Sequence, residues 1–127
     1  MSNCSNSGNL EKGIIAFHNE SYFDAYSLLI PLAKDGCAKA QCYIASMYQN
    51  GFGVPISGLE AVKWYHKAAI QGNMEEHISA IAYNNLGTIY MTGMSEIPSN
   101  SKLAERYWSK AKELGFNMDL CSSTKLS

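Results

Sequence analysis

The sequence predicts an all-α protein, an α/α solenoid of about three helix pairs. Two observations support this prediction. A block of small and aromatic residues recurs along the chain at a nearly fixed interval, which is typical of helical repeat proteins. Within each block the apolar positions follow the period of a helix, and Gly, Pro, Ser and Asn gather between the blocks. We therefore expect six main helices and no sheet.

The clearest copy of the block spans residues 38–72. Its first half recurs forty-two residues later and its second half forty-three residues later, with the extra residue in the loop between the halves. The matched pairs are Ala40 with Ala82, Ile44 with Leu86, Ala45 with Gly87, Tyr48 with Tyr90, Gly51 with Gly93, Ala61 with Ala104, Trp64 with Tyr107, Tyr65 with Trp108, Ala68 with Ala111 and Gly72 with Gly115.

A more divergent copy comes first in the chain, because residues 25–36 match residues 61–72 at a constant offset of thirty-six. The array therefore holds three repeats, each with a first helix (helix A) and a second helix (helix B). The expected division is a flexible leader at 1–9, a repeat domain at 10–115 with repeats at about 10–36, 37–72 and 73–115, and a C-terminal cap or tail at 116–127.

In the first repeat we expect helix A over residues 10–18 and helix B over residues 22–34. Apolar residues keep helical spacing in both segments. Ser21 is a suitable residue for the start of the second helix. Gly36 supplies the left-handed conformation that ends it.

In the middle repeat we expect helix A over residues 38–49 and helix B over residues 59–71. The loop between them contains the sequence NGFGVP, whose two glycines should take positive φ. Ser57 and Glu60 have the spacing of a capping box, which fixes where helix B begins.

The third repeat carries an insertion, NMEEHI, directly before its helix A. Asn73 and Glu76 resemble a second capping box, which would start this helix more than a turn early. The last helix should cover residues 101–114 and stop at Gly115. The aromatic pairs of the B helices, which sit at matched repeat positions, are expected to pack in the core.

Composition excludes several classes of function. The net charge is −1, with 10 basic and 11 acidic residues mixed along the chain, so there is no basic stripe for a nucleic-acid backbone. No apolar run approaches the roughly 18 residues of a membrane span, and the first residues lack the features of an export signal. We therefore expect no nucleic-acid or membrane partner and a cytoplasmic location.

The four cysteines, Cys4, Cys37, Cys42 and Cys121, are expected to be free thiols in that compartment. Their spacing is not that of a zinc site, and none of the three histidines lies in a metal-binding motif. Cys42 and a histidine would make a nucleophilic pair only if the fold joined them, and no sequence signature supports that pair. We expect no cofactor, no metal and no enzymatic activity.

Residues 38–72 also show a family pattern, AxAQxxxxxMYxxGxGVxxxxxxAxxWYxKAAxQG. This pattern resembles the Sel1-like repeat, a relative of the tetratricopeptide repeat. The resemblance covers about residues 10–115, although the third copy lacks GxGV and the first keeps only its second helix and the PLAKDG ending. It implies a right-handed superhelix whose A helices line a concave groove, a role as adaptor or binding scaffold, and no catalytic residue.

The positions of the A helices that do not repeat are free for recognition. They are mostly neutral and polar with a few apolar anchors, which suits a protein or peptide partner. Tyr43 and Tyr83 are further candidates at the rim, because they are outside the matched aromatic set. The candidate partner-binding residues are Phe17, His18, Lys39, Cys42, Tyr43, Ser46, Gln49, Asn50, Asn84, Thr88 and Met91, with Ile14, Ile81 and Thr92 beside them.

Three functional classes stay open on the sequence. The first is a cytoplasmic adaptor that brings two proteins together. The second is a dedicated inhibitor, such as the immunity protein of a bacterial toxin, for which a small single domain is the right size. The third is a structural subunit that stacks end to end. A monomer or weak homodimer is expected for the first two classes.

Overall fold

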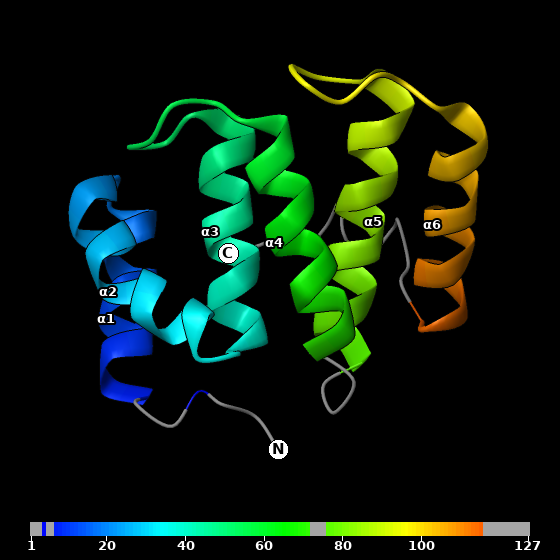
Figure 1. Ribbon diagram of the computed structural model, residues 1–127. Helices are drawn as coiled ribbons and strands as arrows, with labels where there is room; N and C mark the ends of the chain where they lie inside the picture. The colour runs from blue at the N-terminus through cyan, green and yellow to red at the C-terminus, as the bar shows by residue number, and fades with distance from the viewer. Residues whose placement is uncertain (1–3, 5–6, 72–75, 116–127) are drawn as a thin grey trace.

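The computed structural model describes Cys4 and residues 7–71 and 76–115. Its helices form three consecutive antiparallel pairs that stand side by side in one row (Figure 1). The predicted all-α solenoid is confirmed. The first helix begins three residues before the expected Leu10, and the bounds predicted for the helices over residues 22–34, 38–49, 59–71 and 101–114 agree within one residue. The helices are α1 (Ser7–His18), α2 (Tyr22–Lys34), α3 (Ala38–Asn50), α4 (Gly58–Gln71), α5 (Glu76–Thr92) and α6 (Ser101–Glu113).

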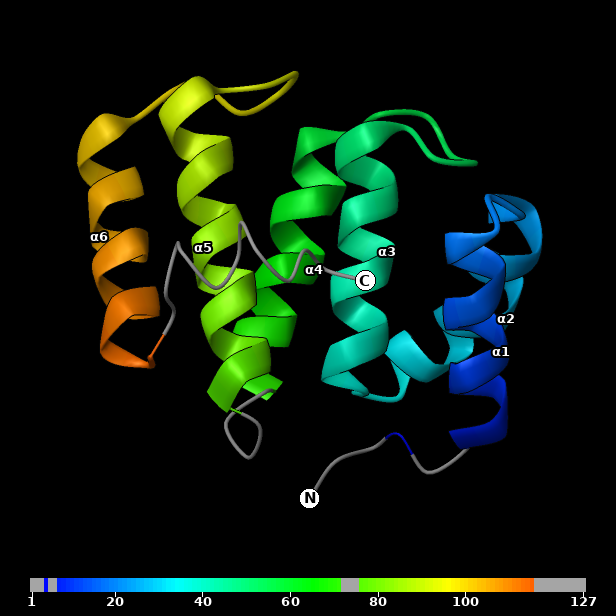
Figure 2. The same ribbon diagram turned by 180° about the vertical axis from the view of Figure 1, so that it is seen from behind.

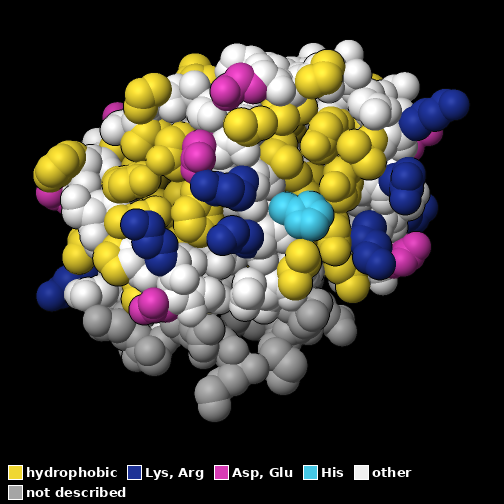
Figure 3. Space-filling view, viewed as in Figure 1, with side chains coloured by type: hydrophobic (Ala, Val, Ile, Leu, Met, Phe, Trp, Pro, Cys, Tyr) yellow, Lys and Arg dark blue, Asp and Glu magenta, His cyan; other side chains and the backbone are white. Residues whose placement is uncertain are grey.

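The A helices α1, α3 and α5 share one face of this row, which we call the A-helix face. Figure 2 shows this face, with α1 and α3 nearer the viewer than α2 and α4. Figure 1 shows the opposite face, and Figure 3, viewed from the same side, shows Lys and Arg side chains scattered there among apolar and acidic ones. The two faces therefore belong to different sets of helices, and the A-helix face is the one expected to bind a partner.

The positions that repeat in the sequence fill the space between the helices. Ala40, Ile44 and Ala45 of α3 are fully buried, as are Ala61 and Ala68 of α4. Small side chains at these positions let neighbouring helices approach closely. Their counterparts in the third repeat are also buried: Ala82, Leu86, Gly87, Ala104 and Ala111.

Successive repeats are joined by a hydrogen bond from a side chain of an A helix to a backbone carbonyl near the end of the preceding B helix. The buried Gln41 side chain of α3 donates from Nε2 to the carbonyl oxygen of Ala33 in α2, at 2.9 Å. One repeat later, Ser79 of α5 donates its hydroxyl to the carbonyl of Ala69 in α4. Ala33 and Ala69 are matched positions, so two different side chains satisfy the same carbonyl near a helix end.

Two glycines end the A helices as predicted. Gly51 and Gly93 have φ of 72° and 74°, in the left-handed region that favours glycine. The predicted capping box at Ser57 is half formed, because the Ser57 hydroxyl accepts from the Glu60 backbone N–H at 3.1 Å. The Glu60 carboxylate does not complete the box and pairs instead with Lys63 at 3.0 Å.

In the second and third repeats, the loop between helices A and B packs on the first residue of the preceding B helix. In the middle repeat, Gly53 lies against Tyr22, where a Cβ would come within 2.7 Å of the Tyr22 Cβ. In the third repeat, Met94 and Ile97 form a single antiparallel bridge, and Ile97 lies against Gly58. The loop of the third repeat thus differs in sequence and in local structure from the loop of the middle repeat. Both loops nevertheless contact the first residue of the preceding B helix.

The expectation of four free thiols is wrong. Cys4 and Cys37 form a disulfide with their Cα atoms 4.7 Å apart. The bond joins the segment before α1 to the residue directly before α3, so it closes a loop around the first helix pair. Cys42 is a free thiol, and Cys121 lies outside the described residues. Sequence spacing gave no sign of this pairing, because the two residues are 33 positions apart and meet only through the fold.

Two further expectations fall outside the described residues. The capping box at Asn73 and Glu76 depends on side chains that the structure does not describe, although α5 does begin at Glu76. The cap or tail at 116–127 is likewise outside. Both stay predictions.

Candidate partner-binding pocket

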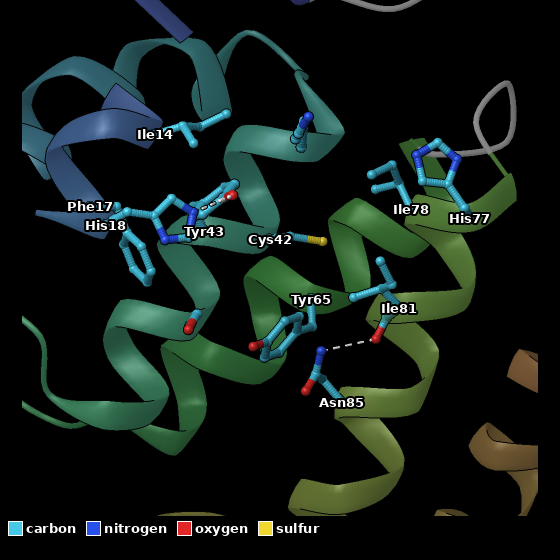
Figure 4. Close-up of a pocket in the computed structure, with 12 residues that line it drawn as sticks. Ile14, Phe17, His18, Cys42, Tyr43, Tyr65, His77, Ile78, Ile81 and Asn85 are labelled. Atoms are coloured by element: carbon cyan, nitrogen blue, oxygen red, sulfur yellow. Dashed lines mark hydrogen bonds between the residues drawn. The ribbon is translucent and has the colours of Figure 1, made fainter. Parts of the chain in front are cut away.

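A pocket of about 360 Å³ opens on the A-helix face, between α1, α3 and α5. This volume lies near the lower end of the range of roughly 300–1,000 Å³ found for ligand sites. Figure 4 shows Phe17, His18 and Tyr43 on one side, Ile78 and Ile81 on the other, and the Cys42 sulfur between them. The lining residues are Ile14, Phe17, His18, Lys39, Cys42, Tyr43, Ser46, Tyr65, His77, Ile78, Ile81 and Asn85.

An aromatic cluster forms the wall on the side of α1. The rings of Phe17 and Tyr43 meet edge to face with centroids 5.0 Å apart. The Tyr43 hydroxyl lies 3.4 Å from His18 Nε2, within hydrogen-bonding distance. Phe17 also contacts Phe52, which stacks on Tyr22, so the wall continues into the loop after α3. These contacts hold the aromatic side chains in place before any partner binds.

The floor of the pocket contains Tyr65, which reaches it from α4. Its hydroxyl donates to Gln49 Oε1 at 2.8 Å, and burial raises the pKa of the phenol above its usual range. Burial also raises the pKa of the adjacent Cys42 thiol to about 12. Because the thiolate is the reactive form, Cys42 is a small apolar lining group at neutral pH rather than a nucleophile.

The wall on the side of α5 is formed by His77, Ile78, Ile81 and Asn85. Three of them are spaced four residues apart and therefore share one helix face. The Asn85 amide donates from Nδ2 to the carbonyl oxygen of Ile81 at 3.0 Å. Its side-chain oxygen adds an acceptor to a wall that is otherwise mostly apolar.

A scan against family models decides the family. The Sel1 repeat model matches residues 38–73 and 80–116, more than half of the chain. The chain belongs to the Sel1-repeat family. Sel1 repeats generally mediate protein–protein interactions and are non-enzymatic. The family model matches two of the three helix pairs, so the pair α1 and α2 counts as a third repeat on its structure and on the divergent sequence match.

Solved structures give the same assignment. The crystal structure of a Sel1 repeat protein from Oxalobacter formigenes is similar, with a TM-score of 0.62 and 33% sequence identity. The similarity covers 72% of this chain and 65% of the other, so this chain spans less than two thirds of the length of that protein. A search of the curated proteins finds no match.

The pocket of this Sel1-repeat protein contains six of the candidate residues predicted from the sequence. They come from α1 and α3, and are Phe17, His18, Lys39, Cys42, Tyr43 and Ser46. Ile14 and Ile81, which were placed beside these candidates, also line it. Whether these side chains bind a partner stays a prediction.

Five candidates lie elsewhere. Gln49 supports the pocket from outside its lining by accepting the Tyr65 hydrogen bond. Asn50 donates to the carbonyl of Ser46 in its own helix. The carbonyl oxygen of Asn84 accepts from Trp108 Nε1 and from the Thr88 hydroxyl, at 3.2 Å each. Met91 is half-buried on α5, outside the lining.

The helix faces explain this division. On α3, Tyr43 contacts α1, while Cys42 lies on the side of the pocket that faces α5. The offset of forty-two maps Cys42 onto Asn84, whose backbone carbonyl accepts a hydrogen bond from Trp108 of α6. A pocket between two A helices is lined by the sides of those helices that face each other. From α5 it is therefore lined by Asn85, which the offset of forty-two matches with Tyr43.

The sequence reasoning missed Tyr65, His77, Ile78 and Asn85 as lining residues. The helical spacing of residues 77, 81 and 85 was an available signal for α5. Tyr65 was assigned to the core, and it is 2% exposed as that assignment requires. Only the structure shows that its hydroxyl end also closes the pocket.

The described part of the chain was also compared with the requirements of a metal site and of a membrane span. There, no group of three or more His, Cys, Asp or Glu side chains is arranged to hold a metal ion. Within the same residues, no helix is both long and apolar enough to cross a membrane.

Proposed function

We propose that this Sel1-repeat protein is a non-enzymatic adaptor that holds a segment of a partner protein in the pocket of the A-helix face. The observation that carries this proposal is the pocket itself, which is lined mainly by side chains that the repeat packing does not use. A solenoid uses its repeating residues for contacts between neighbours, and its variable residues for recognition.

The disulfide bears on where the adaptor works. Disulfides persist in oxidising compartments and are rare in the cytoplasm, where thiols are kept reduced. The Cys4–Cys37 bond therefore favours an oxidising compartment over the cytoplasmic location expected from the sequence.

Partner capture with matched variants tests the proposal. The protein is immobilised, and an extract of the source cells is passed over it, alongside the Ser46→Trp variant. Ser46 lines the pocket, so the indole should fill it and abolish capture of a specific partner. Lys110→Glu, at an exposed position of α6 outside the pocket, is the control and should leave capture unchanged.

The identity of the captured protein separates an adaptor from an inhibitor. A toxin whose activity falls on binding would replace the adaptor role with the inhibitor role at the same site. Capture that survives Ser46→Trp in a folded variant and fails in variants of the opposite face would place the site on the B helices and reject the proposal. Light scattering that shows concentration-dependent growth would instead support a self-stacking subunit.

A further inference from the structure

We infer that the pocket recognises an acidic segment of its partner, in which one bulky apolar side chain enters the cavity and a neighbouring Asp or Glu faces Lys39. This inference rests on the proposed function and specifies the chemistry of the partner. Two observations lead to it: the apolar interior of the pocket and the sign of the charge around it.

The interior accepts an apolar side chain. Ile14, Phe17, Ile78 and Ile81 line it from two sides, and the protonated Cys42 thiol lies between them. The volume of about 360 Å³ is enough for one or two large side chains and too small for a folded element. Since the aromatic wall is already held by edge-to-face contacts, binding requires little ordering of the pocket.

Among the described residues, the single Lys, Arg, Asp or Glu side chain that lines the pocket is basic. Lys39 lines it from α3, and His18 and His77 line it from α1 and α5. None of the described Asp or Glu side chains lines it. Lys39 is exposed, and no ion pair joins it to a carboxylate of the residues that the structure describes. The shallow hollow on α6 differs, because Glu105 lines it together with Lys102 and Arg106.

An acidic ligand is therefore favoured over a basic one. The aromatic rings alone would also attract a cation, but a cation in this pocket would meet Lys39 and no described carboxylate. Replacing a ligand Glu by Lys turns one attraction at the rim into a repulsion. For partly exposed charges a few ångströms apart, that exchange should change the affinity by about tenfold or more at low salt.

Phage display of random dodecapeptides tests this inference. The library is selected on the oxidised, purified protein and, in parallel, on Ser46→Trp. Peptides enriched on the natural sequence alone should carry Asp or Glu within two residues of a Leu, Ile, Met or Phe. The most enriched peptide is then synthesised with a fluorescent label, and its dissociation constant is measured by fluorescence anisotropy.

Charge reversal supplies the matched comparison. Lys39→Glu should weaken binding of that peptide by about tenfold or more, whereas Lys110→Glu should leave it unchanged, because both lysines are exposed and only Lys39 lines the pocket. Replacing the acidic residues of the peptide by Lys should weaken binding to the natural sequence and strengthen it to Lys39→Glu.

The outcomes separate this inference from the proposed function. Enrichment without acidic residues, or equal effects of the two charge reversals, overturns the inference and leaves the adaptor proposal standing. Absence of any peptide enriched over Ser46→Trp contradicts both. If Ser46→Trp loses its helical circular dichroism signal, Lys39→Glu alone decides the inference, since an exposed position tolerates that change.

Discussion

Gly87 of α5 has no side chain because Trp108 of α6 occupies the space beside it. A Cβ at Gly87 would come within 2.5 Å of Trp108 Nε1 and 2.9 Å of Cγ. The indole is held there by its hydrogen bond to the carbonyl oxygen of Asn84, at 3.2 Å. Gly87→Ala should therefore destabilise the protein, although alanine is the better helix former.

The magnitude follows from three effects. Replacing glycine by alanine inside a helix stabilises by about 1 kcal/mol. Forcing a methyl group into a filled space costs about 1–3 kcal/mol. Displacing the indole from its carbonyl partner costs about 1 kcal/mol more. The net loss in the free energy of unfolding should be about 2 kcal/mol, measured by urea denaturation followed by far-UV circular dichroism.

A double-mutant cycle identifies the cause. The middle repeat has Ala45 and Tyr65 at the two matched positions, so Trp108→Tyr should make room for the methyl group of Gly87→Ala. The double variant should be more stable than the sum of the single changes by about 1 kcal/mol or more. Gly8→Ala is the control and should be neutral or slightly stabilising, because a Cβ on this helical glycine would meet no heavy atom within 4 Å.

The reasoning fails if Gly87→Ala raises the stability by the amount that helix propensity alone predicts. It also fails if the cycle is additive, because the two residues would then not compete for the same space.

Three further predictions use the same assay or simple chemistry. Gly51→Ala and Gly93→Ala should each cost about 1 kcal/mol or more, because both glycines have positive φ. Gly93→Ala should cost more, because its methyl group would meet backbone atoms of Ser99 at 3.0 Å, whereas that of Gly51→Ala would meet, at 2.7 Å, the exposed side chain of Ile56, which can move. Alkylation of unfolded, unreduced protein should leave Cys4 and Cys37 unmodified, and Cys4→Ser should lower the stability by about 3 kcal/mol; modification of all cysteines would contradict the disulfide. The free energy of unfolding should fall as the pH rises from 9.0 toward about 12, because burial raises the pKa of the Cys42 thiol from 9.0 to about 12. Over that interval the folded protein keeps a thiol proton that the unfolded chain releases. Cys42→Ala should reduce this loss of stability at alkaline pH, and an unchanged pH profile in that variant would contradict the prediction.

The sequence predicted the helices and their order because their signals are local. Apolar spacing and a glycine at a helix end act within a few residues, whereas Ser21 precedes its helix without making the side-chain cap hydrogen bond expected of it. The helix starting at Tyr22 and the positive φ of Gly51 were therefore predictable, and the structure confirms both. The repeat also showed which residues pack, since one packing solution is used again at matched positions.

The pocket was predictable on α1 and α3, and only in part on α5. Lys39 and Ser46 were found because α3 has a repeat on either side. On α5, the same register selected Asn84 instead of Asn85, a difference of one residue that turns the side chain to another face of the helix.

What the sequence determined by itself is the all-α repeat fold, the bounds of most helices and the buried small residues, since these depend on short-range periodicity. Only the tertiary structure decided that Cys4 meets Cys37, that Tyr65 of α4 closes the pocket, and that Trp108 excludes a side chain at Gly87. Each of these contacts joins residues far apart in the chain, and its existence depends on how helices are placed in three dimensions, which spacing along the chain does not specify.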